Sequence, residues 1–293
     1  MTKLLRANFC RLSKDILFYI VLLVNTALSI LFTSDVHNGI FDSVYLIIQP
    51  FIYSVFVAFF VGKEFGNGTI RNKLVCGHTR SIVYFSYLIT CIIATLASIL
   101  PGVIILCAWN VKFISAIDAS YALLMLLGYL LLHCACCAVF VAVGFAIPSK
   151  AVCVIVVILV AFSGMFLSEM TVQKLEESKT LPDVIINADG THTLVDGDRP
   201  NPKYVDGTPR KILYAVHNIM PQAQISEYCS LLARWNGDWE ETQTVDTSNC
   251  DVTFKDHITV TKDLKYRFFA NQLILITLAT LGGLFVFNKK NLK

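Results

Sequence analysis

The sequence predicts an all-α polytopic membrane protein with six transmembrane helices, plus a small α/β extracellular domain between helices 5 and 6. Of the 293 residues, 55% are hydrophobic and only 15% are charged, whereas a soluble domain usually carries about 25% charged residues. Charges almost vanish from several stretches of about 20 residues, the length that a helix needs to cross a bilayer. One long polar stretch, residues 169–265, interrupts this pattern late in the chain.

Residues 1–15 are expected to form a cytoplasmic amphipathic helix. Basic and apolar side chains alternate there, namely Lys3, Arg6, Arg11 and Lys14 with Leu4, Leu5, Phe9 and Leu12. Such a helix suits the surface of an anionic membrane, and a plain topological anchor would show the same pattern. The apolar run that follows is long and precedes no small-residue cleavage site, so we expect no cleavable signal peptide.

Residues 16–168 should hold the first five transmembrane helices, and residues 266–293 the sixth with a basic cytoplasmic tail. The apolar runs lie at about 16–32, 44–61, 82–107, 121–147, 151–167 and 268–287. Pro101 predicts a kink in the third run. Asn25, Gln49 and His133 fall inside these runs, where polar side chains are costly unless they face the bundle interior. They either line a pathway or bond to a neighbouring helix.

The distribution of Lys and Arg predicts the orientation. Both termini, residues 62–81 and the short turn at 148–150 would share one side, which carries twelve basic residues and only two acids, Asp15 and Glu64. The short loops on the other side contain a single basic residue, Lys112. Because short loops rich in Lys and Arg stay in the cytoplasm, we expect a multi-pass protein of the cell membrane with both termini cytoplasmic.

The polar insert, residues 169–265, is expected to be a small extracellular α/β domain. Residues 184–195 predict two short strands around Ala188, Asp189 and Gly190. A loop should follow over 196–209, and residues 209–234 have helical spacing that is broken at Pro221. Residues 252–254 and 257–261 predict further strands.

The ten cysteines suggest two kinds of site. Cys229 and Cys250 both fall in the predicted external insert, where an oxidising compartment would allow them to form a disulfide. His133, Cys134, Cys136 and Cys137 are zinc-ligand types, but consecutive positions on a helix point in different directions, and small residues suit close helix packing in lipid. We therefore expect no metal site.

Catalytic motifs are missing from the sequence. It has no Gly-x-x-x-x-Gly-Lys-Ser/Thr phosphate loop, no His-Glu-x-x-His and no Gly-x-Ser-x-Gly, the patterns that would indicate nucleotide binding, zinc proteolysis or a nucleophilic serine. We expect neither an enzyme nor a cofactor site on this chain.

The polar stretch at 62–81 predicts a short helix between two transmembrane helices. Asn67 or Thr69 can cap a helix start, and Gly77 is a natural C-terminal stop. Ile70 and Leu74 lie one turn apart on one face. Two turns are too short to be stable alone, so the helix needs a partner surface or the membrane face. A basic membrane-surface linker and a docking element both fit these residues.

Residues 64–80, Glu-Phe-Gly-Asn-Gly-Thr-Ile-Arg-Asn-Lys-Leu-Val-Cys-Gly-His-Thr-Arg, resemble the segment between spans 2 and 3 of ABC-2 type transporter permeases. In that family an acidic residue precedes Gly-Thr, a short amphipathic helix and a small-residue turn with Ser/Thr-Arg. Six spans, internal termini and a large external loop are also similar. Residues 201–210, Met220-Pro221 and the basic tail resemble a Gram-positive bacterial subgroup, although Gln222-Ala223 depart from its small residue and glycine.

The resemblance implies a coupling helix at 64–80 that docks on a cytoplasmic ABC ATPase subunit, through Glu64, Thr69, Ile70, Arg71, Lys73, Leu74 and Arg80. ATP and Mg would be bound by that partner. A second permease copy or a related permease and membrane lipids are further expected partners, and nucleic acid is not. The implied function is ATP-driven export of a peptide, antimicrobial or lipid-like compound. The alternative is a non-transporting membrane sensor whose extracellular domain binds a ligand or partner, although the sequence contains no cytoplasmic signalling domain.

Overall fold

The computed structural model describes residues 1–33, 43–109, 119–186, 192–225, 228, 242–247, 250–255 and 263–290. The helices are α1 (Thr2–Leu12), α2 (Ile16–Thr33), α3 (Ser43–Gly66), α4 (Thr69–Val75), α5 (Arg80–Trp109), α7 (Ala119–Ala146), α8 (Lys150–Glu176), α9 (Thr208–Ile219) and α11 (Asp263–Lys289). The strands are β1 (Thr180–Ile186), β2 (His192–Pro200), β3 (Thr242–Thr247) and β4 (Cys250–Lys255).

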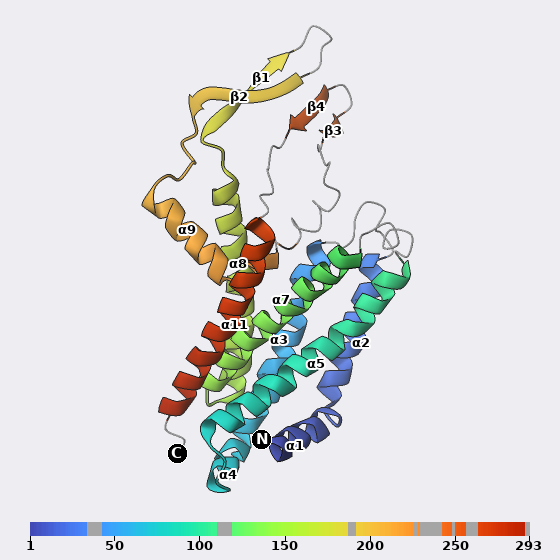
Figure 1. Ribbon diagram of the computed structural model, residues 1–293, viewed down its shortest axis with the longest axis vertical. Helices are drawn as coiled ribbons and strands as arrows, with labels where there is room; N and C mark the ends of the chain where they lie inside the picture. Colours follow the sequence, from blue (N-terminus) through green and yellow to red (C-terminus); the bar gives the residue numbers. More distant parts are fainter. Residues whose placement is uncertain are drawn as a thin grey trace.

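The long helices form a bundle with two different ends. Figure 1 shows α1, α4 and the end of α11 at one end, and α9 with the strands at the other. We call the first the basic end, because the basic side chains of α1, the α3–α5 segment and the starts or ends of α8 and α11 gather there, namely Arg11, Lys63, Arg71, Lys73, Arg80, Lys150, Lys289 and Lys290.

Within the described residues, five helices are long and apolar enough to cross a membrane, or six if the bent pair α1–α2 forms one span. The prediction of a polytopic helical protein is confirmed at that level. Two helices extend beyond the apolar runs seen in the sequence: α3 continues through Gly66, past residue 61, and α8 continues through Glu176, past residue 167. α3 can continue because the charged residues near its end are paired. α8 can continue because its last turns contain neither Gly nor Pro.

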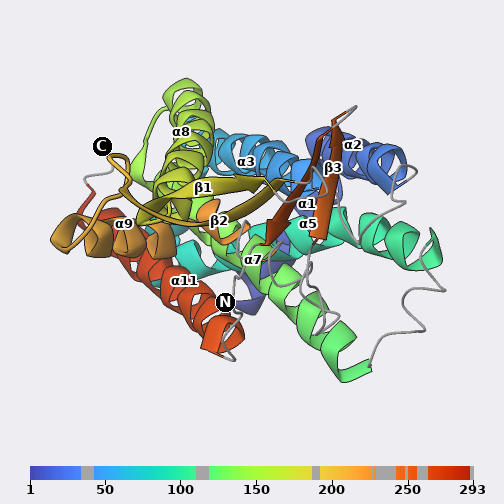
Figure 2. The same cartoon turned by 90° about the horizontal axis from the view of Figure 1, so that it is seen from above.

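The helices differ in how much protein surrounds them. α3, α8 and α11 each have an apolar stretch that is long enough to cross a membrane. In α3, 61% of that stretch is buried inside the protein, against only 22% in α8 and 17% in α11. Seen from above, α9 and α11 lie on one side of the bundle and α2 on the opposite side (Figure 2). The outer faces of α8 and α11 are thus left for the surroundings of the bundle.

The polar side chains within the apolar helices bond to neighbouring helices. Asn25 Nδ2 donates to Ser98 Oγ at 3.3 Å. Gln49 Oε1 accepts from the Tyr129 hydroxyl at 2.7 Å and lies 2.7 Å from His133 Nε2. Of the two interpretations offered by the sequence, helix-to-helix bonding is the one observed. Among the residues the structure describes, no three His, Cys, Asp or Glu side chains converge as a metal site would require.

The strands form one sheet in the order β1-β2-β4-β3. β1 and β2 pair antiparallel, with Ile186 opposite His192, as the predicted hairpin requires. β2 extends through Pro200, so the loop predicted from residue 196 begins later. α9 ends before Pro221 as predicted, and β4 covers the predicted strand at 252–254. The strand predicted at 257–261 lies outside the described residues.

The extracellular domain and its disulfide remain predictions. The sheet and α9 supply its predicted mixture of helix and strand, although α8 takes up residues 169–176. Cys250 begins β4, whereas Cys229 lies outside the described residues.

Candidate functional site

The short helix α4 is joined to α3 by a tight turn at the basic end of the bundle. Gly68, between the two helices, adopts the left-handed conformation with φ of 67° and is the N-cap of α4. The Thr69 hydroxyl donates to the Glu64 carbonyl at 3.0 Å, so it satisfies the free end of α3. The prediction that Asn67 or Thr69 caps the start of α4 was therefore wrong, because the turn is so short that α3 uses the hydroxyl.

The end of α4 is a Schellman motif. Gly77 has φ of 87°. Its N–H donates to the Leu74 carbonyl at 3.0 Å, and the His78 N–H donates to the Lys73 carbonyl at 3.2 Å. This pair of bonds, with glycine in the left-handed position, defines the motif. The predicted stop at Gly77 is confirmed.

Two glycine substitutions should have opposite effects on stability. A Cβ added at Gly77 or at Gly282 of α11 would meet no atom within 4 Å, so only backbone conformation matters. Gly77→Ala should lower the free energy of unfolding by about 1–2 kcal/mol, the cost of a left-handed alanine. Gly282→Ala should raise it by about 0.5–1 kcal/mol, because glycine is unfavourable inside a helix. Titration with SDS in mixed micelles measures both, and a gain at Gly77 would contradict the Schellman geometry.

The inner side of α4 joins a buried polar cluster centred on Glu64, which is fully buried at the end of α3. Arg11 of α1 forms an ion pair with Oε1. Lys73 of α4 lies 3.1 Å from Oε2, and the Tyr87 hydroxyl of α5 donates to the same oxygen. Asn8 of α1 accepts from Lys73 Nζ at 3.3 Å. These five residues, here called the Glu64 cluster, connect α1, α3, α4 and α5.

The Glu64 cluster holds two cations against one carboxylate. Burial, and next the nearby Arg11 guanidinium, lower the pKa of Lys73 from its usual 10.5 to about 8. A second and more exposed ion pair joins Lys63 to Asp15, with 2.9 Å between Lys63 Nζ and Asp15 Oδ2. Glu64 is therefore the group that allows Arg11 and Lys73 to approach each other inside the protein.

The outer side of α4 is uncovered. Arg71 and Asn72 are exposed, and Val75 keeps 80% of its surface accessible. On the inner side Ile70 is buried and Leu74 packs against the core. The structure thus divides the predicted docking residues: Glu64, Ile70 and Lys73 face inward, Leu74 is partly covered, and Arg71 faces outward.

Arg80, the last of the predicted docking residues, connects α5 to α11. Its Nη1 donates to the carbonyls of Phe287 at 2.7 Å, Asn288 at 2.9 Å and Lys290 at 2.6 Å. A guanidinium on these carbonyls caps the C-terminus of α11 and complements its dipole. Lys290 in turn donates to the Phe145 carbonyl of α7 at 2.9 Å.

Sequence reasoning missed three members of the Glu64 cluster: Asn8, Arg11 and Tyr87. One signal was present in α1, where Leu4, Asn8 and Leu12 follow each other at a spacing of one turn, and all three are buried. A polar residue in the middle of an apolar stripe indicates a specific buried partner, since an unpaired buried amide is costly. Tyr87, within an apolar run, gave no such signal.

The chain matches no protein-family model, no curated protein and no solved structure. The resemblance of residues 64–80 to ABC-2 type permeases therefore remains an expectation from the sequence.

Proposed function

We propose that the chain is the permease subunit of an ATP-driven ABC exporter for a peptide, antimicrobial or lipid-like compound. α4 docks on a separate ATP-binding subunit, which holds ATP and Mg. One observation carries the proposal: α4 is fixed to the bundle on its inner side and uncovered on its outer side.

The fixed inner side explains how so short a helix can serve as a docking element. Seven residues do not form a stable helix in water by themselves. Buried Ile70, the Lys73–Glu64 ion pair and the Schellman motif at Gly77 hold α4 in place. A partner that binds its outer side therefore meets a preorganised surface, which lowers the entropic cost of association.

The composition of the outer side suits a protein partner. Val75 is a large apolar side chain with 80% of its surface accessible, and Arg71 beside it is exposed. The buried core of a protein interface is more apolar than the rest of the surface, and arginine is enriched there. Both residues lie at the basic end, beyond the apolar stretch of α3, which ends at Gly66.

The Glu64 cluster provides a route for the work done by the ATPase subunit. A push on α4 is transmitted through Lys73 to Glu64 of α3, and through Glu64 to Arg11 of α1. Tyr87 includes α5 in the same unit. In the proposed mechanism these helices change tilt together around a pathway that forms between two permease subunits.

The positive-inside rule gives the proposed orientation. The basic end carries the N-terminus, the end of α11 and α4 (Figure 1), and short segments rich in Lys and Arg stay in the cytoplasm. The proposed location is the cell membrane, with both termini and α4 on the cytoplasmic side, where an ATPase subunit can reach α4.

Two native cysteines, one just before α5 and one near its far end, allow a direct test. Cys76 caps α4 and is exposed, and Cys107 is exposed near the far end of α5. Two variants would each keep one of them, with Cys10, Cys229, Cys250 and the other member replaced by serine. Each variant would be labelled with a maleimide photo-crosslinker in membranes that also contain a candidate ABC ATPase subunit.

We expect a covalent adduct with the ATPase from Cys76 and none from Cys107. Mass spectrometry of the adduct would identify the partner. An adduct from Cys107 alone, or from neither cysteine while the two proteins still co-purify, would refute docking at α4.

A further inference from the structure

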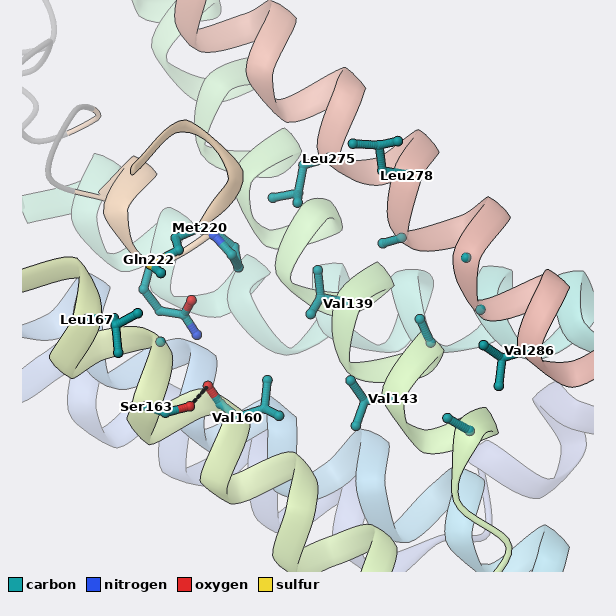
Figure 3. A pocket seen from close by; sticks show the side chains of 17 residues that line it. Val139, Val143, Val160, Ser163, Leu167, Met220, Gln222, Leu275, Leu278 and Val286 are labelled. Atoms are coloured by element: carbon teal, nitrogen blue, oxygen red, sulfur yellow. Dashed lines mark hydrogen bonds between the residues drawn. The ribbon is translucent and has the colours of Figure 1, made fainter. Parts of the chain in front are cut away.

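An apolar groove of about 530 Å³ runs between α7, α8 and α11. Figure 3 shows Leu167 and Gln222 toward one end, Val286 toward the other, and Val139 and Val143 of α7 between them. The groove is lined almost entirely by apolar side chains. Its polar side chains are Gln222, in the turn at residues 220–222, and Ser163 of α8. The volume falls in the range of about 300–1,000 Å³ typical of small-molecule sites.

We propose that this groove binds one acyl chain of an anionic phospholipid, drawn from the leaflet at the basic end. This inference rests on the proposed function only in requiring that the apolar helices cross a bilayer. It needs no ATPase partner and no transported substrate.

The position of the groove points to lipid. Its walls include α8 and α11, whose apolar stretches are only 22% and 17% buried inside the protein. Neighbouring lining residues on α11, such as Leu278, keep 54% of their surface accessible. In a bilayer these outer faces meet hydrocarbon, so the mouth of the groove opens toward lipid chains.

The length of the groove matches one leaflet. Along α11 the lining runs from Leu275 to Val286, which is about 16 Å at about 1.5 Å per residue. The hydrocarbon core of a bilayer is about 30 Å thick, so one leaflet spans about 15 Å.

The groove is closed at its far end. Gln222 Nε2 donates to the Ala161 carbonyl of α8 at 3.4 Å, and the Gln222 side chain lies 2.5 Å from where a Cβ on Gly164 would stand. A transmembrane helix from a second copy must cross both leaflets and would extend past this turn, whereas the groove spans about one leaflet. A single acyl chain ends where the groove ends.

Charge at the open end favours an anionic headgroup. Lys289 follows Val286 by three positions, so it continues the lining stripe of Leu275, Gly282 and Val286 on one face of α11. It is exposed, and its ammonium lies 4.3 Å from the Phe285 ring centroid. Within the described part of the chain Lys289 has no ion-pair partner. A lipid phosphate at the membrane surface would supply one.

Native mass spectrometry in detergent can measure this binding with phosphatidylglycerol and with phosphatidylcholine of the same chains. A Cβ at Gly282 meets open space, so Gly282→Phe fills the groove without moving the backbone. Leu281→Phe is its control, because Leu281 is exposed beside the groove and does not line it. Lys289→Gln removes the headgroup contact, and Lys3→Gln removes another exposed charge, on α1.

We expect the wild-type protein to retain one phosphatidylglycerol in preference to phosphatidylcholine. Gly282→Phe should weaken that retention more than about tenfold, since several buried methylene groups lose their site. Lys289→Gln should reduce the preference for the anionic lipid about fivefold, as expected for one lysine near a headgroup. Leu281→Phe and Lys3→Gln should behave as the wild-type protein does.

Three results would overturn the proposal. Equal retention of both lipids would show that the groove does not select an anionic headgroup. Unchanged retention in Gly282→Phe would place the lipid elsewhere. Loss of a dimer in Gly282→Phe, without loss of lipid, would assign the groove to a second copy of the chain.

Discussion

Glu64→Gln should lower the free energy of unfolding by about 3 kcal/mol. The substitution keeps the size of the side chain but leaves Arg11 and Lys73 close together without their carboxylate. Breaking a buried ion pair on one side costs about 3–5 kcal/mol. We expect the lower value because the Arg11 side chain is 38% exposed and can turn toward water. Unfolding by SDS in mixed micelles, followed by circular dichroism, measures the change.

Lys63→Gln is the matched control for the Glu64 prediction. It breaks the neighbouring Lys63–Asp15 pair, in which the lysine side chain is 36% exposed, so the expected loss is below about 1 kcal/mol. The double variant Glu64→Gln with Lys73→Met should be more stable than Glu64→Gln alone, because one uncompensated cation is gone. Equal losses for Glu64→Gln and Lys63→Gln, or strict additivity in the double variant, would show that the Glu64 cluster does not hold these helices together.

The existence of the long helices could be predicted because each depends on local composition. An apolar run of suitable length forms a helix in lipid whatever its neighbours are. The stop of α4 could also be predicted, since Gly77 alone supplies the left-handed residue. The end of α3 could not. Lys63 and Glu64 resemble the boundary of a transmembrane helix, but each is paired with a residue of the α1–α2 segment, far away in the sequence.

The candidate site shows the same division between local and tertiary information. The amphipathic pattern identified α4 and grouped Ile70 with Leu74, which indeed face the core. It could not show that Lys73 faces inward while Arg71 faces outward, because that depends on where Glu64 and Tyr87 lie. Gln222, noticed only as a departure from the family pattern, is the side chain that closes the apolar groove.

Val75→Asp should separate docking from stability. Val75 keeps 80% of its surface accessible, so the substitution removes little packing and should change the free energy of unfolding by less than about 0.5 kcal/mol. If α4 docks on an ATPase subunit, the same change places a charge at the centre of an apolar contact. Loss of a hot-spot residue at an interface costs about 2 kcal/mol or more, so if Val75 is such a residue, membrane-stimulated ATP hydrolysis should fall more than about tenfold.

Ile212→Asp provides the control. Like Val75, Ile212 is an exposed apolar residue on a helix, with 57% of its surface accessible. It lies on α9, at the end of the bundle opposite α4 (Figure 1). It should leave hydrolysis unchanged. Together with Glu64→Gln, the pair distinguishes two roles within one short segment. Glu64→Gln should weaken both stability and ATPase coupling, whereas Val75→Asp should weaken coupling alone. Full ATPase stimulation in Val75→Asp would rule out the outer side of α4 as the docking surface, even if Glu64→Gln proves as destabilising as expected.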